Sequence, residues 1–269
     1  AEGIIELASY IGQIVSRPFN LSEGLLIRCN VLRISNDEHV LGIVLHHAIT
    51  DGWSLGIMAK ELSAFYNHFA YQVPLMLKPL AIQYADYALW QRKYLTGTQL
   101  SEDLVYWKEQ LLNAPEESSF PSDRPRPKVS SYQGGKLTAK LAKNKVEELG
   151  LLAKNQGATL FMVLLASMKA LLYRYSGQED LVIGTPIAGR THQELEGLIG
   201  FFVNVLPIKM NIDPSLSFSE LLSQVKKESL EVFSNQHIPP NKIEAAIQIM
   251  LVWQDKWRQP LDLIGLETK

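Results

Sequence analysis

A short apolar segment, a pair of histidines and an Asp-Gly dipeptide follow one another in this chain, and this order constrains the fold most strongly. Residues 39–45 are apolar and rich in branched side chains, which predicts a strand buried on both faces. Apolar residues recur at helical spacing over 53–69, which predicts an amphipathic helix. We therefore expect the two histidines to close a strand and the Asp-Gly dipeptide to open the next helix.

This placement gives each polar residue a chemical possibility. Successive side chains on a strand point to opposite faces, so we expect one of His46 and His47 to face a cleft and the other to be packed. Asp51 falls at the N-cap position, where its carboxylate can accept a hydrogen bond from the amide of Trp53 or Ser54. A neutral imidazole beside a helix N-terminus is a place where an amine can be deprotonated and an oxyanion stabilised.

Gly52 adds a further possibility, because it permits close approach of the backbone to a ligand and torsions closed to other residues. A plainer interpretation stays open, in which the histidines are core residues satisfied by backbone carbonyls and Asp51 is only a helix cap. No metal site is predicted, because zinc-binding histidines on a helix stand four residues apart with a Glu between them, whereas adjacent strand histidines cannot chelate one ion.

The stretch from His46 to Gly56 resembles the active-site motif of nonribosomal peptide synthetase condensation domains, which belong to the chloramphenicol acetyltransferase-like superfamily. The resemblance extends over nearly the whole chain and follows the order of the family's motifs. Segments that resemble other motifs of the family lie at 17–21, 24–28, 84–91, 106–111, 183–190 and 194–204.

The fold class predicted from strands that alternate with helices is α/β. The resemblance implies a two-lobed chloramphenicol acetyltransferase-like fold, a V-shaped pseudo-dimer with a tunnel between the lobes. We expect a partial N-terminal lobe over 1–113, a crossover rich in Pro, Ser and Gly over 114–135, and a partial C-terminal lobe over 136–269. The family's opening and closing motifs are not recognisable, so the first lobe is expected to be incomplete and the chain to be an excerpt, a fragment or a decayed copy.

The periodicity of the remaining sequence predicts further elements. In chain order we expect a helix over 4–15, a strand over 25–34, two helices within 81–112, a strand over 136–141, helices over 143–155 and 159–175, a strand over 181–185, a helical turn over 194–200, a strand over 202–210, a helix over 217–234, a strand over 248–254 and a last piece over 261–266.

The resemblance also implies roles for single residues. His47 would be the central active-site residue, which positions, or also deprotonates, the attacking α-amine of an acceptor aminoacyl thioester. His46 and Asp51 would be structural, and Asp51 would form an ion pair with an arginine. Arg28 and Arg190 are both candidates for that arginine, and the sequence leaves the choice open.

Further residues of the same motifs would complete the site. The Gly52 amide is a candidate donor to the tetrahedral oxyanion, and Trp53, Ser54 and Asn204 would line the cleft. The Trp-Ser pair after Asp-Gly is typical of condensing members of the family, whereas heterocyclising members replace the histidines with aspartates. The sequence therefore favours peptide-bond formation.

Composition bears on cofactors and partners. The net charge is −2 without a basic run, so neither nucleic acid nor a membrane is an expected partner, and no apolar run is long enough to span a bilayer. Cys29 stands alone, which favours a small buried residue, a reducing compartment and a cytoplasmic location. The resemblance implies no cofactor bound by the domain itself. Both substrates would arrive on phosphopantetheine arms of donor and acceptor peptidyl carrier domains, beside a neighbouring adenylation domain.

Two other functions stay open. The chain can be an inactive condensation-domain fragment or a scaffold that docks carrier domains, because parts of the family pattern are not recognisable. It can also be a free acyltransferase that uses acyl-coenzyme A, although the condensation-type motifs beyond the histidines argue against this.

Overall fold

The computed structural model describes residues 2–96, 98–116, 120–125, 127–129, 131, 133–239, 242–243, 245–254 and 260–268. Its backbone forms two compact units. Unit 1 comprises Ala1–Ala88, Arg190–Phe202 and Asp255–Lys269, and unit 2 comprises Leu89–Gly189 and Val203–Gln254. The predicted lobes at 1–113 and 136–269 are continuous in sequence and do not follow this grouping, because the segment 190–202 packs with the first part of the chain. The division into these two lobes stays a prediction.

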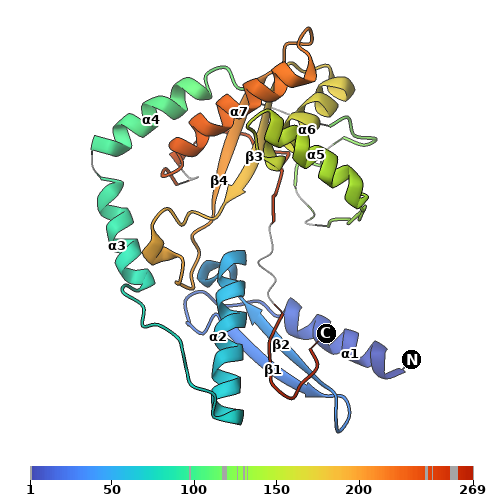
Figure 1. Ribbon diagram of the computed structural model, residues 1–269, viewed down its shortest axis with the longest axis vertical. Coiled ribbons are helices and arrows are strands. Elements are labelled where there is room, and N and C mark those ends of the chain that lie inside the picture. The colour runs from blue at the N-terminus through green and yellow to red at the C-terminus, as the bar shows by residue number, and fades with distance from the viewer. Residues whose placement is uncertain are drawn as a thin grey trace. The chain divides into compact units, whose positions relative to one another are not determined.

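Unit 1 is built on a two-stranded antiparallel sheet (Figure 1). Ile27 lies opposite Leu45 and Arg33 lies opposite His39, so the two strands pair along their whole length. Helix α1 contacts β2. The elements of this unit are α1 (Glu2–Ser16), β1 (Ile27–Arg33), β2 (His39–Leu45), the 3₁₀ turn η1 (His47–Ile49), α2 (Gly52–Tyr71), the first turn of α3 (Tyr84–Tyr94) and the 3₁₀ turn η2 (Gln193–Leu195).

The sheet of unit 1 is more exposed than the sequence predicts. Alternate residues of β1 are exposed, among them Val31 at 68%, and no residue of β2 is fully buried. The prediction of a strand buried on both faces is therefore wrong, because within the described residues β1 and β2 pair only with each other. The prediction that Cys29 is buried is wrong for the same reason, since it lies on the exposed face of β1.

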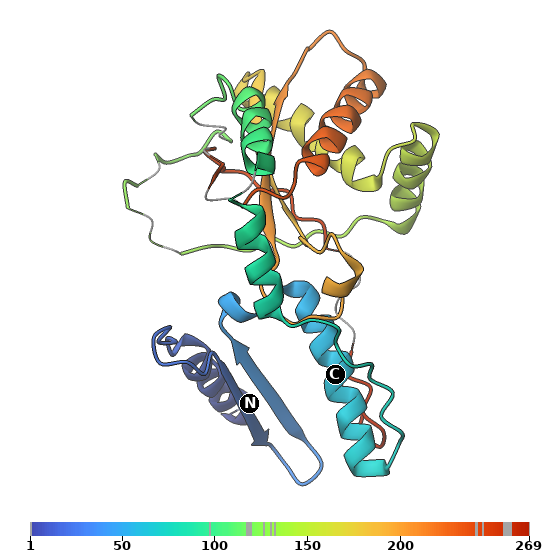
Figure 2. The same cartoon turned by 90° about the vertical axis from the view of Figure 1, so that its left-hand side faces the viewer.

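Unit 2 contains a second antiparallel pair of strands, with Asp180 opposite Asn211 and Ile187 opposite Asn204. Helix α7 contacts both β4 and α6, and α6 contacts α5 (Figures 1 and 2). The elements are the rest of α3, then α4 (Thr98–Gln110), α5 (Lys143–Asn155), α6 (Leu160–Ser176), β3 (Asp180–Ile187), β4 (Asn204–Asn211) and α7 (Phe218–Ser234).

The core of unit 2 is apolar. The central residues of β3 and β4 are buried, and helices α6 and α7 direct buried leucines and valines toward the same cluster. Trp107 of α4 joins it at 2% exposure, and its indole Nε1 donates to the carbonyl oxygen of Asn235 at 3.0 Å. Full burial of one such side chain contributes about 1.5–3 kcal/mol, so this cluster is the main source of stability in the unit.

Local signals in the sequence explain where the helices begin and end. Asp51 and Thr159 cap α2 and α6 by accepting hydrogen bonds from the amides of Ser54 and Met162. Ser217 opens α7 with a reciprocal capping box that involves Glu220. After α5 and α6, Gly157 and Gly177 turn the chain with φ of +56° and +69°.

Three predicted elements differ from the structure. Residues 136–141 form no strand, although apolar and polar residues alternate there, because the segment has no partner strand among the described residues. Leu137 is 97% exposed. Residues 248–254 form a single bridge, in which the Gly184 amide and carbonyl bond the backbone of Ile249 and Leu251 at 2.9 Å. The turn predicted over 194–200 is the shorter η2.

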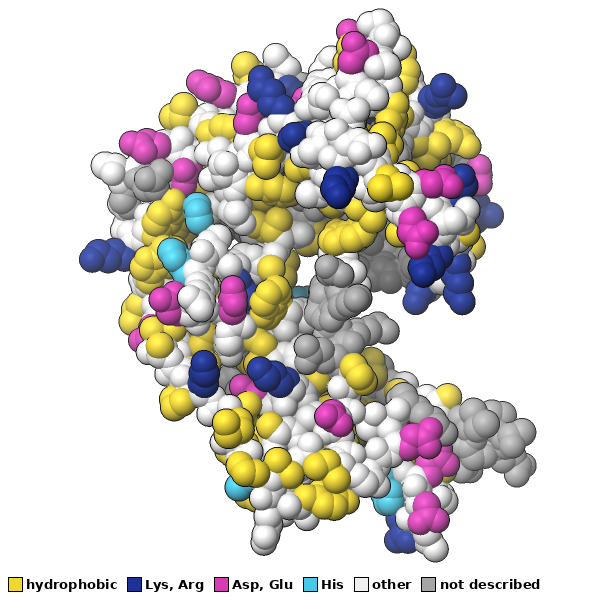
Figure 3. All heavy atoms as spheres, in the orientation of Figure 1, with side chains coloured by type: hydrophobic (Ala, Val, Ile, Leu, Met, Phe, Trp, Pro, Cys, Tyr) yellow, Lys and Arg dark blue, Asp and Glu magenta, His cyan; other side chains and the backbone are white. Residues whose placement is uncertain are grey.

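The described residues contain no single helix that is both long and apolar enough to cross a bilayer. Among these residues, the helices α5 and α6 are together long and apolar enough, but the pair is bent by 101°. Acidic and basic side chains are interspersed on the face shown in Figure 3. Within the described part of the chain, no group of three or more His, Cys, Asp or Glu side chains could hold a metal ion.

Candidate active site

The two histidines lie at the end of β2 and have different environments. His46 precedes η1, and its Nδ1 accepts a hydrogen bond from the Ala48 amide at 3.0 Å. His47 opens η1, and its side chain is exposed. Because the strand ends at Leu45, the expected alternation of two strand residues does not apply; the cap on η1 separates the two rings instead.

The aromatic neighbours of the two rings differ as well. The ring of His46 meets Phe19 edge-on with centroids 5.9 Å apart, and the ring of His47 meets Phe201 edge-on with centroids 5.2 Å apart. Because Nδ1 of His46 is an acceptor, its proton lies on Nε2 in the neutral form. His46 therefore shapes the turn, whereas the imidazole of His47 is open to solvent.

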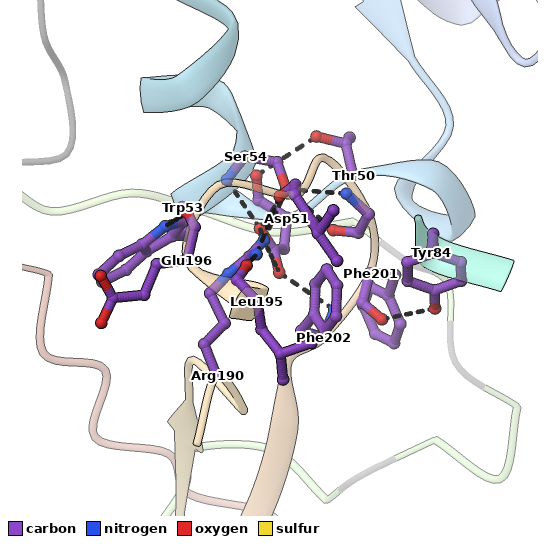
Figure 4. Close-up of polar contacts among 12 residues, drawn as sticks. Thr50, Asp51, Trp53, Ser54, Tyr84, Arg190, Leu195, Glu196, Phe201 and Phe202 are labelled. Carbon is purple, nitrogen blue, oxygen red and sulfur yellow. Dashed lines mark hydrogen bonds and ion pairs between the residues drawn. The ribbon is translucent and has the colours of Figure 1, made fainter. Parts of the chain in front are cut away.

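Asp51 occupies the predicted N-cap of α2 and is almost completely buried, at 2% exposure. Its Oδ1 accepts from the amide of Ser54 at 2.8 Å and from the Ser54 hydroxyl at 2.7 Å. Its Oδ2 accepts from the amide of Phe202 at 3.1 Å. The carboxylate therefore joins the start of α2 to a backbone segment about 150 residues later in the chain (Figure 4).

Arg190 is the cation that balances this carboxylate. Its Nη2 lies 3.2 Å from Oδ1 and 3.4 Å from Oδ2 of Asp51, and both side chains are buried. Its Nη1 donates to the carbonyl oxygens of Leu195 and Leu198, and its guanidinium lies 4.1 Å from the centre of the Phe202 ring. A buried pair with this many additional hydrogen bonds offsets more of its desolvation cost than a bare ion pair does.

The alternative partner of Asp51, Arg28, makes other contacts. Its Nη2 donates to the carbonyl oxygen of Arg17, and its guanidinium lies 3.9 Å from the centre of the Phe19 ring. Arg28 therefore holds the loop before β1, and the structure assigns the ion pair with Asp51 to Arg190. The suggestion that Arg28 forms this pair is wrong, since its side chain is occupied by the loop 17–19.

Ser54 links these groups. Its hydroxyl is fully buried. The hydroxyl oxygen accepts hydrogen bonds from Arg190 Nη2 at 2.9 Å and from the Gly200 amide at 3.1 Å. The hydroxyl proton has two acceptors within 2.9 Å, Asp51 Oδ1 and the Gly200 carbonyl oxygen. This burial is at odds with the predicted cleft-lining position, because every direction around the hydroxyl is occupied by the polar cluster. We call Asp51, Ser54 and Arg190 the polar clamp.

The electrostatic consequence of the clamp is a pair of opposite charges held away from water. Burial lowers the pKa of Arg190, and the charge of Asp51 opposes that shift. Burial, followed by the Asp51 charge, raises the pKa of Tyr84, so its phenol stays protonated. The Tyr84 hydroxyl donates to the carbonyl oxygen of Phe201 at 2.8 Å, which adds a further tie between α3 and the segment 190–202.

The remaining predicted site residues are accounted for as follows. Trp53 is 42% exposed, and its Nε1 donates to the carbonyl oxygen of Glu196 at 2.9 Å, so the indole is anchored at Nε1 and partly open to solvent. Gly52 is the first residue of α2 and is helical, so the prediction of unusual torsions is wrong; the N-cap Asp51, with φ of −133°, makes the turn instead. Asn204, in unit 2, is 9% exposed and donates to the carbonyl oxygens of Gln236 and Ile238.

The arrangement presents an exposed imidazole at His47, five residues before Gly52 opens a 20-residue helix. The first amides of a helix have no partners within it and carry a partial positive charge, so they favour a developing oxyanion. An exposed neutral imidazole can hydrogen-bond or deprotonate an amine. These are the requirements for the attack of an amine on an activated acyl group.

Comparison with known proteins agrees with this chemistry. The sequence model of the condensation domain family matches residues 2–261. The chain belongs to the condensation domain family. This condensation domain is 44% identical over 232 residues to a component of the linear gramicidin synthase of Brevibacillus parabrevis, a match that covers 86% of the chain and 4% of that protein. It is 43% identical over 223 residues to phosphinothricin tripeptide synthetase PhsC of Streptomyces viridochromogenes, a match that covers 83% of the chain and 20% of that protein.

Solved structures show the same fold. The condensation domain superposes on the X-domain from teicoplanin biosynthesis with a TM-score of 0.81 at 26% identity, over 91% of this chain and 55% of that one. It superposes on a holo four-domain nonribosomal peptide synthetase with a TM-score of 0.77 at 27% identity, over 93% of this chain and 20% of that one. The first condensation domain of the CDA synthetase, at 20% identity and a TM-score of 0.75, shares the fold.

These comparisons confirm the predicted family and the α/β, chloramphenicol acetyltransferase-like fold class. The chain is a condensation domain of the nonribosomal peptide synthetase type, a context of secondary-metabolite biosynthesis. It spans about half the length of the X-domain structure it matches and a small part of the curated synthetases.

Two functional contacts were not predicted from the sequence. One is the role of Ser54 as the centre of the clamp, and the other is the position of Phe201 against His47. A signal existed for the first, because Ser54 stands three residues after the cap, where its amide and hydroxyl can both reach the carboxylate. The second depends on a contact over 154 positions of sequence, for which one sequence carries no signal.

Proposed function

We propose that this condensation domain forms a peptide bond between a donor acyl or peptidyl thioester and an acceptor aminoacyl thioester. The observation that carries the proposal is the exposed imidazole of His47, shortly before the first residue of a helix whose N-cap, Asp51, forms a buried ion pair with Arg190. Family membership supports the reaction class.

His47 is the residue of the pair that is suited to meet the substrate. His46 uses its Nδ1 on the Ala48 amide, whereas His47 is exposed. The acceptor nitrogen attacks the thioester carbonyl carbon, a C–N bond forms and the C–S bond breaks. The proton lost by the amine passes to the leaving thiolate, either through His47 as a base or through solvent while His47 holds the amine by a hydrogen bond.

Gly52 supplies the second part of the proposal. It is the first residue of α2, so its amide belongs to the turn whose N–H groups are not used within the helix. We assign this amide to the oxyanion of the tetrahedral intermediate. Trp53 follows Gly52 in the chain, and its half-exposed indole is anchored by a hydrogen bond to Glu196. We assign this indole to the lining of the substrate cleft.

No covalent enzyme intermediate is required, because a thioester is already activated toward amines. The protein then acts mainly by bringing the two reactants together in the correct orientation, which can contribute about 7–11 kcal/mol in well-oriented reactions. Relatives within peptide synthetases favour substrates that arrive on phosphopantetheine arms of donor and acceptor carrier domains, next to an adenylation domain. The domain itself needs no cofactor for this step.

The test uses the whole protein that contains this chain, a donor carrier and an acceptor carrier, both loaded, with mass spectrometry of the carrier-bound products. The wild type is expected to make the dipeptidyl carrier, and His47→Ala is expected to lower its single-turnover rate by about 10²–10⁴-fold, as for loss of an acid–base residue. The matched control is His39→Ala, which removes an exposed histidine from the other end of the same strand and should leave the rate unchanged.

Three results would contradict the proposal. Product formation at the wild-type rate by His47→Ala would remove the residue from the mechanism. Turnover of free acyl-coenzyme A in preference to carrier-bound donors would indicate a free acyltransferase. Binding of loaded carriers without any product would indicate a docking scaffold.

A further inference from the structure

Phe201 is the aromatic side chain in contact with His47 and has no role in the mechanism so far. Their rings meet edge-on, with an interplanar angle of 85° and centroids 5.2 Å apart. Phe201 is nevertheless 39% exposed. A phenyl ring that is both fixed against the proposed catalytic imidazole and open to solvent is positioned to touch whatever binds that imidazole.

The backbone on both sides of Phe201 is held by the polar clamp. The amide of Gly200 donates to the Ser54 hydroxyl at 3.1 Å, and the amide of Phe202 donates to Asp51 at 3.1 Å. The carbonyl oxygen of Phe201 itself accepts from Tyr84 at 2.8 Å (Figure 4). With its own carbonyl and both flanking amides hydrogen-bonded, the main chain of Phe201 is held in place, which limits the rotamers open to its side chain.

Close packing restricts the segment further. A Cβ atom added to Gly200 would lie 2.2 Å from Cδ2 of Tyr84, so the tyrosine ring rests directly on the backbone next to Phe201. An added Cβ atom at this distance from the ring could be accommodated only if the backbone or Tyr84 shifted. The position of Phe201 is therefore set by contacts on its own main chain and not by burial of its ring.

The neighbouring Phe202 shows that packing does not require the Phe201 ring. Phe202 is 4% exposed, stacks against Arg190 and lies with its centroid 4.7 Å from that of Tyr87. It belongs to the small apolar cluster with Leu195 and Leu198, and Phe201 does not. Both phenylalanines belong to unit 1, but Phe202 lies in its apolar cluster, whereas Phe201 is partly exposed beside His47.

We propose that Phe201 is a selectivity residue that contacts the acceptor's side chain and also orients His47, with apolar aminoacyl thioesters as the class it favours. This inference rests on the proposed function. An amine held within about 3 Å of the imidazole has its α-carbon one bond further away. The acceptor side chain then starts within reach of a ring whose centroid is 5.2 Å from that of His47. An apolar side chain gains by covering the exposed phenyl edge, and glycine does not.

The test is a competition between glycyl and leucyl acceptor carriers in the whole protein, with the product ratio measured by mass spectrometry. Phe201→Ala is expected to lower the preference for leucine over glycine by about tenfold or more, the range found when apolar contacts are lost from a specificity pocket. Phe201→Leu keeps apolar area and should retain most of the preference. Phe19→Ala is the matched control, since it removes the ring that meets His46 edge-on, and it should leave the ratio unchanged.

A second measurement does not need substrates. With isotope-labelled histidine, the ring-proton resonances of His47 are expected to move in Phe201→Ala, because the edge-on phenyl ring is lost, and to stay in place in Phe19→Ala. An unchanged product ratio in an active Phe201→Ala protein, or unmoved His47 resonances, overturns the inference and leaves the proposed function intact. If the wild type makes no product from either acceptor while the His47 resonances respond as expected, the proposed function fails and the selectivity claim fails with it.

Discussion

The two antiparallel strand pairs of this chain are similar in length but differ in how they are stabilised. In unit 2, β3 and β4 have an almost continuous run of buried residues and are packed against α6 and α7. In unit 1, β1 alternates between exposed and half-buried residues, and β2 has no fully buried residue. One pair is the centre of an apolar core, and the other is a partly covered sheet that carries the histidines at its end.

The difference extends to the groups that hold each unit together. Unit 2 depends on apolar area, with Ile208 and Leu206 completely buried. Unit 1 has a small apolar cluster of Leu195, Leu198 and Phe202, and next to it the clamp of Asp51, Ser54 and Arg190. The comparison indicates that polar contacts, which are directional, position the proposed active site, whereas non-directional apolar burial stabilises the scaffold.

The largest effect is expected from Arg190→Met. It leaves the Asp51 carboxylate buried without its cation, which costs about 3–5 kcal/mol in comparable cases. Hydrogen exchange measured by mass spectrometry should show loss of protection over residues 190–202 and at the start of α2. Arg190→Lys keeps the charge but loses contacts of the guanidinium, so it should give a smaller loss. Unchanged exchange in Arg190→Met would show that the clamp does not hold this segment.

Matched isoleucine substitutions probe the two sheets directly. Ile208→Ala in β4 removes a side chain with 0% exposure and is expected to lower the free energy of unfolding by about 2–5 kcal/mol. Ile27→Ala in β1 removes one that is 40% exposed and should cost about 1 kcal/mol or less. Denaturant titration followed by circular dichroism measures both. If both variants lost the same free energy of unfolding, the two sheets would not differ in how they are stabilised.

A matched pair of glycines tests the close packing beside the site. Gly200→Ala brings a methyl group against the Tyr84 ring and is expected to destabilise by about 1–3 kcal/mol. Gly150→Ala in α5 meets no atom within 4 Å and should stabilise the helix by about 0.5–1 kcal/mol. Thermal unfolding measures both: the midpoint temperature should fall for Gly200→Ala and rise for Gly150→Ala. A shift in the same direction in both variants would contradict the prediction.

The smallest expected effect concerns a charge inside the apolar unit. Lys169 is fully buried 3.8 Å from Glu228, and burial lowers its pKa to about 8. In the unfolded chain its pKa is about 10.4, so between pH 8 and 9 the unfolded state binds more protons, and stability should rise by about 1 kcal/mol. Above pH 10 stability should fall, because Tyr94 and Tyr106 have pKa values raised to about 12 in the folded chain.

Denaturation midpoints between pH 8 and 9 check this prediction. Lys169→Met should abolish the rise. The control is Lys145→Met, which changes an exposed lysine paired with Glu148 on the surface of α5 and should keep it. If the denaturant concentration at the midpoint fell between pH 8 and 9 in the wild type, the lowered pKa of Lys169 would be contradicted.

Sequence alone predicted the elements whose signals are local. Helix α5 and strand β2 have the predicted bounds, α2 begins after the predicted cap Asp51, and α6 and α7 begin within one residue of their predicted starts. These succeed because caps, glycine stops and 3.6-residue periodicity act within a few residues. The resemblance to the family, and not a local signal, implied the ion pair of Asp51, and it left the arginine open between Arg28 and Arg190.

The failures depend on contacts between distant residues. Residues 136–141 alternate like a strand but lack a described partner, and the exposure of Cys29 depends on what covers β1. The burial of Ser54 and the placement of Phe201 result from packing of the segment 190–202 against α2, which neither segment encodes by itself. Propensity and periodicity are short-range signals, so they cannot supply these results.

The most direct test of the central claim, that the clamp makes the proposed active site competent, is a double-mutant cycle on the single-turnover rate of dipeptidyl-carrier formation. The variants are Asp51→Asn, Arg190→Met and the two combined, in the whole protein. Because the two side chains are in contact, the account predicts that each single change lowers the rate and that the combined variant loses no more than the worse single one. Wild-type rates in both single variants, or losses that simply multiply, would contradict it.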